Sequence, residues 1–298
     1  MSPIPRRFAA DLALLAVAGF WGLTFPLGKI VLSALGPFTY LAVRFSIAAL
    51  TLIAGVMARR APVPQRAWLL GGAVGAVLFL GYALQTSGLA LTTAAKSGFI
   101  TGLSVAMVPV LSAAWFRRTP RPTVLAGIAV ETAGLALLTL NEAVQMNLGD
   151  LLVLGCAFCF ALHIVLVGRL TRAFDPLGFA AAQIVTVAVL SALAAFTERP
   201  VPAVAAAPAA VWGMIAFMAV TGTIGAFLIQ VWAQRFTTAS HTGLMFTFEP
   251  VAAALAAYLI LGEVLAGRQA LGAALIFAGI VLAELNQEAL EIATEGES

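Results

Sequence analysis

Long apolar runs of about twenty residues alternate along the chain with short segments that hold most of the charged residues, prolines and glycine clusters. A helix needs roughly 20 apolar residues to cross a hydrocarbon layer of about 30 Å. Helix is the expected state of these runs, because an isolated strand in lipid would leave its backbone hydrogen-bonding groups unpaired. The pattern predicts ten membrane-spanning helices, at residues 9–28, 38–58, 67–89, 93–116, 122–141, 149–169, 177–197, 209–233, 239–261 and 267–286.

The composition strengthens this prediction. Of the 298 residues, 62% are hydrophobic and only 10% are charged, whereas soluble domains have about 45–50% apolar and about 25% charged residues. A soluble core could not bury so much apolar surface, so lipid is the expected solvent for most of the chain. The net charge of +3 does not indicate a nucleic-acid partner, because the sixteen Lys and Arg residues are scattered between the apolar runs.

The positions of these cations predict the orientation in the membrane. Eleven arginines fall on the side that holds the N-terminus, and only Lys29, Lys96, Arg199 and Arg268 fall on the other, while Arg44 lies inside the second run. By the positive-inside rule, both termini are expected in the cytoplasm. The first run could be mistaken for a signal peptide, but it is too long and nine more follow it, so an uncleaved helix is expected.

Two stretches with the same pattern indicate an internal repeat. TTAAKSGFITG at 92–102 and TTASHTGLMFT at 237–247 are related by a shift of 145 residues, which places His241 on Lys96. This shift, together with a shift of 139 in the earlier helices, also aligns Gln85 with Gln230, Gly98 with Gly243, Pro37 with Pro176 and Trp21 with Phe160. Five helices per repeat is an odd number, so the second copy is expected to enter the membrane inverted, as in many secondary transporters.

The predicted fold class is therefore an all-α integral membrane protein of ten transmembrane helices in two inverted five-helix repeats. The first repeat covers residues 9–141 and the second covers residues 149–286. Residues 287–298 form an acidic cytoplasmic tail that is expected to be disordered, like the first residues of the chain.

Four segments carry a more specific pattern: FWGLTFPLGK at 20–29, VRFSIAAL at 43–50, TTAAKSGFITGLSVAMVPVL at 92–111 and FTFEPVAAALAAYLILGEVL at 246–265. They resemble the paired EamA domains of the drug/metabolite transporter (DMT) superfamily, over residues 9–286. The resemblance implies that helices 1–4 and 6–9 surround a central cavity, with helices 5 and 10 at the periphery. It also implies export of amino acids or other small metabolites across a bacterial inner membrane, and it leaves the substrate open.

Ionisable residues inside the predicted helices are candidate substrate-binding residues, because a charge at the centre of a helix costs about 2.5–3.5 kcal/mol on insertion scales. Arg44 could offer a bidentate fork to a carboxylate or phosphate, or it could hydrogen-bond helix-end carbonyls. Glu249 could bind a proton or a substrate amine, or it could support a kink at Pro250. Glu131, in the middle of the fifth predicted helix, has no evident role.

Three candidates share one predicted face, because His241, Met245 and Glu249 follow one another at i+4 spacing. That face is expected at the cytoplasmic mouth of the cavity, and Lys96 is expected at the outer mouth because the repeat is inverted. Interfacial snorkelling is the alternative for Lys96 and His241. For His163, in the sixth predicted helix, the alternative is a packing role.

Four uncharged candidates complete the predicted site. Trp21 lies near the middle of the first helix, outside the interfacial belt where tryptophan is usual, and it could form a stacking wall or a core contact. Tyr82, Gln85 and Gln230 offer hydrogen bonds near the ends of the third and eighth helices.

The predicted function is secondary transport of a small molecule by alternating access, with the lipid bilayer as surroundings, protons as a possible coupling ion, and no cofactor or metal. No phosphate loop, GxSxG elbow or HExxH motif occurs. Cys156 and Cys159 form a lone CxxC inside an apolar helix, which does not favour a redox or zinc site. The alternatives are an uncoupled metabolite carrier, a non-transporting receptor or scaffold, and an intramembrane enzyme, which would need a nucleophile and base that the sequence does not offer.

Overall fold

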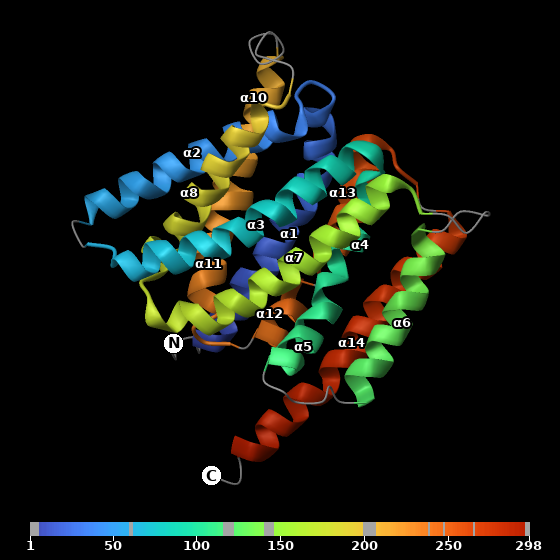
Figure 1. Ribbon diagram of the computed structural model, residues 1–298. Coiled ribbons are helices and arrows are strands. Elements are labelled where there is room, and N and C mark those ends of the chain that lie inside the picture. The colour runs from blue at the N-terminus through green and yellow to red at the C-terminus, as the bar shows by residue number, and fades with distance from the viewer. Residues whose placement is uncertain are drawn as a thin grey trace, which may run out of the picture.

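The computed structural model describes residues 6–59, 62–115, 122–139, 146–198, 207–237, 239–246, 248–264 and 266–295. Within these ranges every regular element is a helix (Figure 1). Eight of the described helical segments are long and apolar enough to cross a membrane, at residues 8–32, 37–58, 65–91, 94–115, 148–173, 176–195, 209–233 and 241–261. The chain is therefore a multi-pass membrane protein.

The helices of the first half are α1 (Arg6–Leu32), α2 (Pro37–Ala58), α3 (Gln65–Leu91), α4 (Ala94–Gly102), α5 (Ser104–Trp115) and α6 (Pro122–Thr139). Those of the second half are α7 (Leu148–Leu170), the short η1 (Thr171–Ala173), α8 (Pro176–Ala195), α10 (Ala209–Ala219), the π-helical η2 (Val220–Gly225), α11 (Ala226–Ala233), α12 (Ala239–Phe246), α13 (Phe248–Leu261) and α14 (Gly267–Glu295). Each predicted run is helical over most of its length. Since α6 and α14 are not among the eight apolar segments, the count of ten spans stays a prediction.

The helix expected at 93–116 has one irregularity near its middle, a single turn residue at Leu103 that separates α4 from α5. The backbone of Leu103 keeps right-handed helical angles, and residues 94–115 together form one apolar segment long enough to cross a membrane. The helix expected at 239–261 is described as α12 and α13, and residue 247 between them lies outside the described residues. A Cβ on Gly102 would lie 2.9 Å from Pro250 Cγ, so α4 and α13 pack closely there.

The C-terminal tail also differs from expectation, because α14 continues as a helix to Glu295. The sequence ELNQEALEIATE, which ends this helix, is rich in Glu, Leu and Ala. These residues have high helix propensity, and this favours helical continuation over the predicted disorder.

Close helix packing builds the bundle. α2 packs along α8, α3 packs along both α7 and α8, and α1 packs along α13. A Cβ on Gly88 of α3 would lie only 2.7 Å from the carbonyl oxygen of Gly149, so a larger residue there would separate α3 from α7. α6 and α14 lie side by side at one edge of the bundle (Figure 1), with Gly134 against Gly272.

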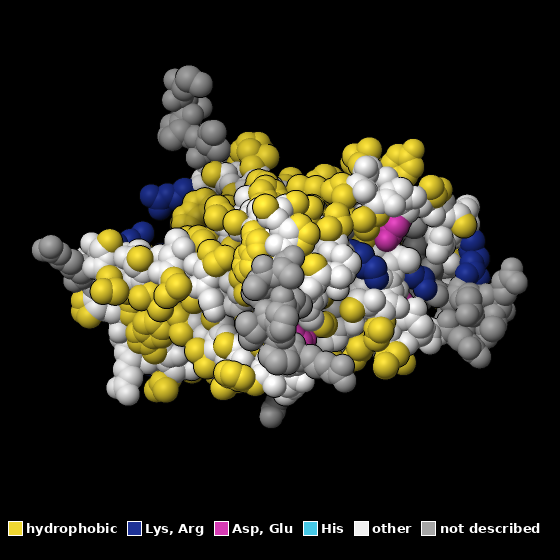
Figure 2. Space-filling model, turned by 90° about the horizontal axis from the view of Figure 1, so that it is seen from above, with side chains coloured by type: hydrophobic (Ala, Val, Ile, Leu, Met, Phe, Trp, Pro, Cys, Tyr) yellow, Lys and Arg dark blue, Asp and Glu magenta, His cyan; other side chains and the backbone are white. Residues whose placement is uncertain are grey.

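Large apolar side chains cover the outside of the bundle. Figure 2 shows hydrophobic side chains over much of one face, with only a few charged groups between them. Exposed apolar residues occur on helices of both halves, among them Phe8, Leu50, Leu69, Leu193, Leu255 and Leu271. An apolar surface of this extent fits a lipid environment.

Candidate functional site

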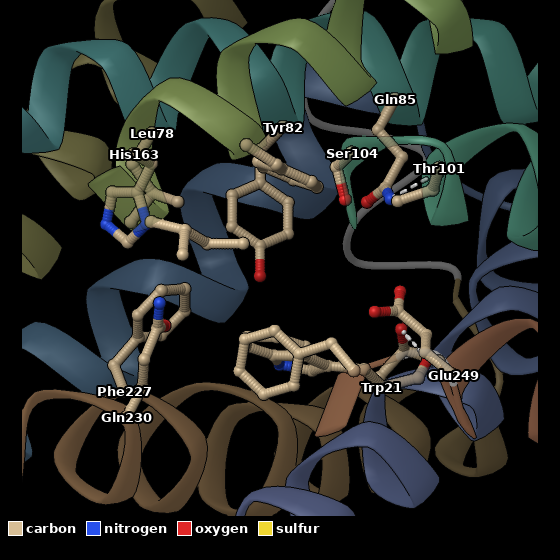
Figure 3. Close-up of a pocket in the computed structure, with 14 residues that line it drawn as sticks. Trp21, Leu78, Tyr82, Gln85, Thr101, Ser104, His163, Phe227, Gln230 and Glu249 are labelled. Carbon is tan, nitrogen blue, oxygen red and sulfur yellow. Dashed lines mark hydrogen bonds between the residues drawn. The ribbon is translucent and has the colours of Figure 1, made fainter. Parts of the chain in front are cut away.

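A cavity lies inside the bundle, where the centres of water-sized molecules could occupy about 40 Å³; the empty space around it is about 480 Å³ when open solvent is included. It is bounded by α1, α3, α4, α5, α7, α11, α12 and α13 (Figure 3). Its lining residues are Trp21, Thr24, Leu78, Tyr82, Gln85, Thr101, Ser104, Phe160, His163, Ile164, Phe227, Gln230, Phe246 and Glu249.

The turn at Leu103 supplies part of this lining. Thr101 and Ser104 lie on either side of it, on α4 and α5. Phe246 on α12 and Glu249 on α13 come from the corresponding segment of the second half.

Many lining positions correspond between the two halves of the chain. Under the offset of 139 residues, Trp21 corresponds to Phe160 and Thr24 to His163; under the offset of 145, Tyr82 corresponds to Phe227, Gln85 to Gln230, Thr101 to Phe246 and Ser104 to Glu249. Each half thus contributes matched positions to one cavity, but the chemistry at those positions differs. Glu249 corresponds to Ser104 under the offset of 145, or to Val108 when a local gap aligns Pro109 with Pro250, and neither counterpart is acidic.

Glu249 is the acidic residue of the lining. Its side chain is buried, with the residue 8% exposed, and the carboxylate points into the cavity (Figure 3). Within the described part of the chain, no hydrogen bond or ion pair is found for this carboxylate, so it is available to a ligand.

Aromatic rings form the opposite part of the wall. Trp21 lies with its ring centroid 4.8 Å from that of Phe246 and 5.7 Å from that of Phe227. Tyr82 packs edge-on against Phe160 at 5.2 Å and against Phe227 at 6.3 Å. The cavity therefore combines one carboxylate with five aromatic side chains.

Three further polar side chains line the cavity, and they differ in their hydrogen bonding. Gln85 Nε2 donates to Thr101 Oγ1 at 3.2 Å. His163 Nε2 lies 2.7 Å from Gln183 Oε1, a contact in which this nitrogen donates. Gln230 is fully buried, and neither its amide oxygen nor its amide nitrogen has a partner among the described residues. Buried amides without partners are unusual in proteins, and this one points toward the cavity (Figure 3).

Arg44 lies behind the cavity wall and supports the π-helical segment η2. Its Nε donates to Thr223 Oγ1 at 2.9 Å, and its Nη2 donates to the Gly222 carbonyl at 3.1 Å. A third donor, Nη1, lies 3.1 Å from the Tyr40 hydroxyl. Trp21 Nε1 donates to the same Gly222 carbonyl at 2.9 Å. These contacts match the alternative in which Arg44 binds helix carbonyls, and Arg44 is not part of the cavity lining.

Lys96 forms an ion pair at one end of the bundle. Its Nζ lies 3.2 Å from Asp150 Oδ2, and the Thr92 hydroxyl donates to Asp150 Oδ1 at 2.6 Å. The Asp150 side chain is almost fully buried and is on α7, so the pair joins the start of α4 to the start of α7. Lys29 lies near the C-terminal end of α1 and donates to the Thr92 carbonyl at 2.6 Å. The ion pair of Lys96 and Asp150 therefore lies at the C-terminal end of α1.

His241 forms the corresponding pair at the opposite end. Its Nε2 lies 3.0 Å from Asp11 Oδ1, which joins the start of α12 to the start of α1. Asp11 and Lys29 are 18 residues apart on α1, which is about 27 Å along the helix at 1.5 Å per residue. The offset of 145 relates Lys96 to His241, and the offset of 139 relates Asp11 to Asp150. The two ion pairs therefore consist of residues that correspond between the two halves of the sequence.

The remaining predicted residues lie away from the cavity. Met245 packs against the apolar core cluster around Leu14 and Phe246. Of the three residues predicted to share one face, Glu249 lines the cavity, whereas His241 and Met245 are not part of its lining. The side chain of Glu131 falls outside the described residues.

An apolar helical bundle with ionisable side chains facing an internal cavity fits a membrane transporter. The chain belongs to the EamA-like transporter family, which matches residues 8–140 and again residues 147–285. This membership agrees with the resemblance in the sequence to the EamA domains of the DMT superfamily.

Relatives and a solved structure agree with this membership. An uncharacterized transporter of Archaeoglobus fulgidus is 31% identical over 94% of this chain and 87% of its own length. The uncharacterized transporter YyaM of Bacillus subtilis is 26% identical over 91% of this chain and 92% of its own length. A crystal structure of a protein at 23% sequence identity superposes with a TM-score of 0.71, covering 95% of this chain and 99% of that one. At that identity the likeness establishes the fold alone.

Proposed function

We propose that this protein is a secondary transporter that exports amino acids or related small metabolites across a bacterial inner membrane by alternating access, with both termini in the cytoplasm. The observation that carries the proposal is the cavity lined by both halves of the chain, with the Glu249 carboxylate in it and no described partner for that carboxylate. In secondary transporters built from repeats, substrate and ion sites lie at the interface of the repeats near the centre of the membrane.

The matched ion pairs support the alternating-access part of the proposal. Lys96–Asp150 and His241–Asp11 lie at opposite ends of α1, and each joins helices of different halves of the chain. In an inverted repeat, one mouth opens by the motion that closes the other. We propose that each pair closes one mouth and that the two pairs break in turn.

Locking either mouth is expected to stop transport. In one variant Lys96 and Asp150 are both replaced by cysteine, and in the other Asp11 and His241 are both replaced. A short, reducible thiosulfonate cross-linker should abolish counterflow of substrate in proteoliposomes for both variants, and reduction should restore it. Substrate counterflow is measured before cross-linking, after it, and after reduction.

The control is each single-cysteine variant with the same reagent, in a background where the buried Cys156 and Cys159 are replaced by alanine. A single cysteine should leave transport at its untreated rate. Full transport in either cross-linked double variant would contradict alternating closure of the two mouths, because a carrier that works by alternating access needs both.

The function itself is tested by purified protein in liposomes loaded with a mixture of amino acids, amines and related metabolites, with efflux followed by mass spectrometry. Loss of at least one compound faster than from protein-free liposomes is expected. Retention of every compound would contradict transport of this substrate class and would favour a receptor or scaffold. Efflux that no ion gradient accelerates would favour the uncoupled carrier.

A further inference from the structure

The charges around the cavity are distributed unevenly. Glu249 places a carboxylate inside it, without a described partner. The basic candidates are already engaged. His163, which lines the cavity, donates to Gln183. Outside the lining, Arg44 is engaged with the η2 segment, Lys96 with Asp150, and His241 with Asp11. A substrate carboxylate would therefore enter a cavity whose negative charge is open and whose neighbouring positive charges are occupied.

The aromatic wall suits the same kind of ligand. A cation within about 6 Å of an aromatic ring centroid is attracted by the ring face, and Trp21, Tyr82 and Phe246 bound the same cavity as Glu249. The remaining rings, Phe160 and Phe227, offer apolar surface to the rest of the ligand. One end of a ligand thus meets a carboxylate and aromatic rings, and the other end meets apolar surface.

Gln230 adds a hydrogen-bonding position. Its amide is buried and has neither its donor nor its acceptor matched by a described residue. An unpaired buried amide is costly, and a ligand that pairs it removes that cost. A hydroxyl group on the apolar body of the ligand can both donate and accept, and so it fits this amide.

Resting on the transport function proposed above, we propose that the substrate class of this cavity is primary amines with an aromatic or apolar body, and that a carboxylate next to the amine is excluded. Glu249 pairs with the ammonium group, the aromatic wall surrounds it, and Gln230 binds a polar group on the body. The protein then exports decarboxylated amines in preference to the parent amino acids.

Matched ligand pairs test this inference directly, because each pair differs only by one carboxylate. The pairs are phenethylamine and phenylalanine, tyramine and tyrosine, and tryptamine and tryptophan. The half-saturation concentration for counterflow in proteoliposomes is expected to be at least about tenfold lower for each amine, since a like-charge contact costs that much or more. Tyramine is expected to bind more tightly than phenethylamine if Gln230 pairs with its hydroxyl.

Binding is measured separately by thermal denaturation of the purified protein in detergent, where a ligand of the folded state raises Tm. The amines should raise Tm of the natural protein and of Glu249→Asp, but not of Glu249→Gln. Glu263→Gln is the matched control, because Glu263 accepts the backbone N–H groups of Ala94 and Ala95 outside the cavity, and it should keep the preference for amines.

The outcomes separate the two proposals. Tighter binding or faster transport of the amino acids than of the amines would overturn the substrate class and leave the transport function standing. Binding of amines without transport would overturn the transport function and leave the substrate class standing. No rise in Tm with any amine, or an equal rise in Glu249→Gln, would also overturn the substrate class.

Discussion

Glu249→Gln is expected to make transport independent of a pH gradient across the membrane. The substitution keeps the size of the side chain and its hydrogen-bonding capacity but removes the group that can gain and lose a proton. If Glu249 is the coupling site, an imposed gradient should accelerate efflux from liposomes of the natural protein. The residual efflux through the variant, whose binding of amines is weakened, should be the same with and without the gradient. Efflux of a labelled substrate is compared with and without the gradient at the same internal pH.

The other titratable side chains of the lining give the control. They are Tyr82 and His163, and His163 already donates to Gln183. His163→Asn should keep the response to the gradient, since the proposed coupling proton does not pass through this imidazole. A response that survives in Glu249→Gln and disappears in His163→Asn would show that the histidine couples transport, and it would contradict the role proposed for the carboxylate.

Arg44→Met is expected to destabilise the protein strongly. The guanidinium is 3% exposed and donates to Thr223, Gly222 and Tyr40. Its loss leaves buried acceptors unmatched, and each unmatched group costs about 1–3 kcal/mol. The change in stability is measured as the fall in Tm of the purified protein, with Trp fluorescence as the readout.

Arg44→Lys is the matched control for charge. Lysine keeps the positive charge but cannot donate along the same planar fork, so its Tm should lie between those of the natural protein and Arg44→Met. An unchanged Tm in Arg44→Met, combined with lost binding of carboxylate-bearing ligands only, would contradict the structural role and would assign Arg44 to the substrate.

The repeat in the sequence accounts for much of the cavity. The offset of 139 aligns Trp21 with Phe160, and the offset of 145 aligns Gln85 with Gln230. All four residues line the same cavity in the structure. Tyr82 also lines it, and so do His163 and Glu249. A buried polar or large aromatic residue in a membrane span is costly outside a cavity or a protein interior, so these positions could be recognised from composition and position alone.

The ion pairs were missed for a different reason. Lys96 has no acidic residue close to it in sequence, and its partner Asp150 follows 54 residues later on another helix. Side-chain periodicity relates residues on one helix and gives no information on pairs between helices. A signal did exist, because the offset of 139 places Asp150 on Asp11, the partner of His241.

The turn at Leu103 could not be predicted from the local sequence. No proline marks that residue, since Pro109 lies six residues beyond it. Gly102, next to Leu103, lies against Pro250 of the other half. A contact between segments so distant in the chain is a property of the assembled bundle, and local propensity does not contain it.

The π-helical segment η2 coincides with one extra residue in the second half. Trp68 and Trp212 are 144 residues apart, whereas Gln85 and its counterpart Gln230 are 145 apart, so this interval is 17 residues long in the first half and 18 in the second. A π turn takes up one extra residue within a continuous helix, and η2 lies inside that interval, where its Gly222 carbonyl accepts from both Trp21 and Arg44. A chain of two identical halves would hold a substrate equally well in two reversed orientations. One inserted residue, together with a cavity acid that comes from the second half, makes the two ends of this binding site different.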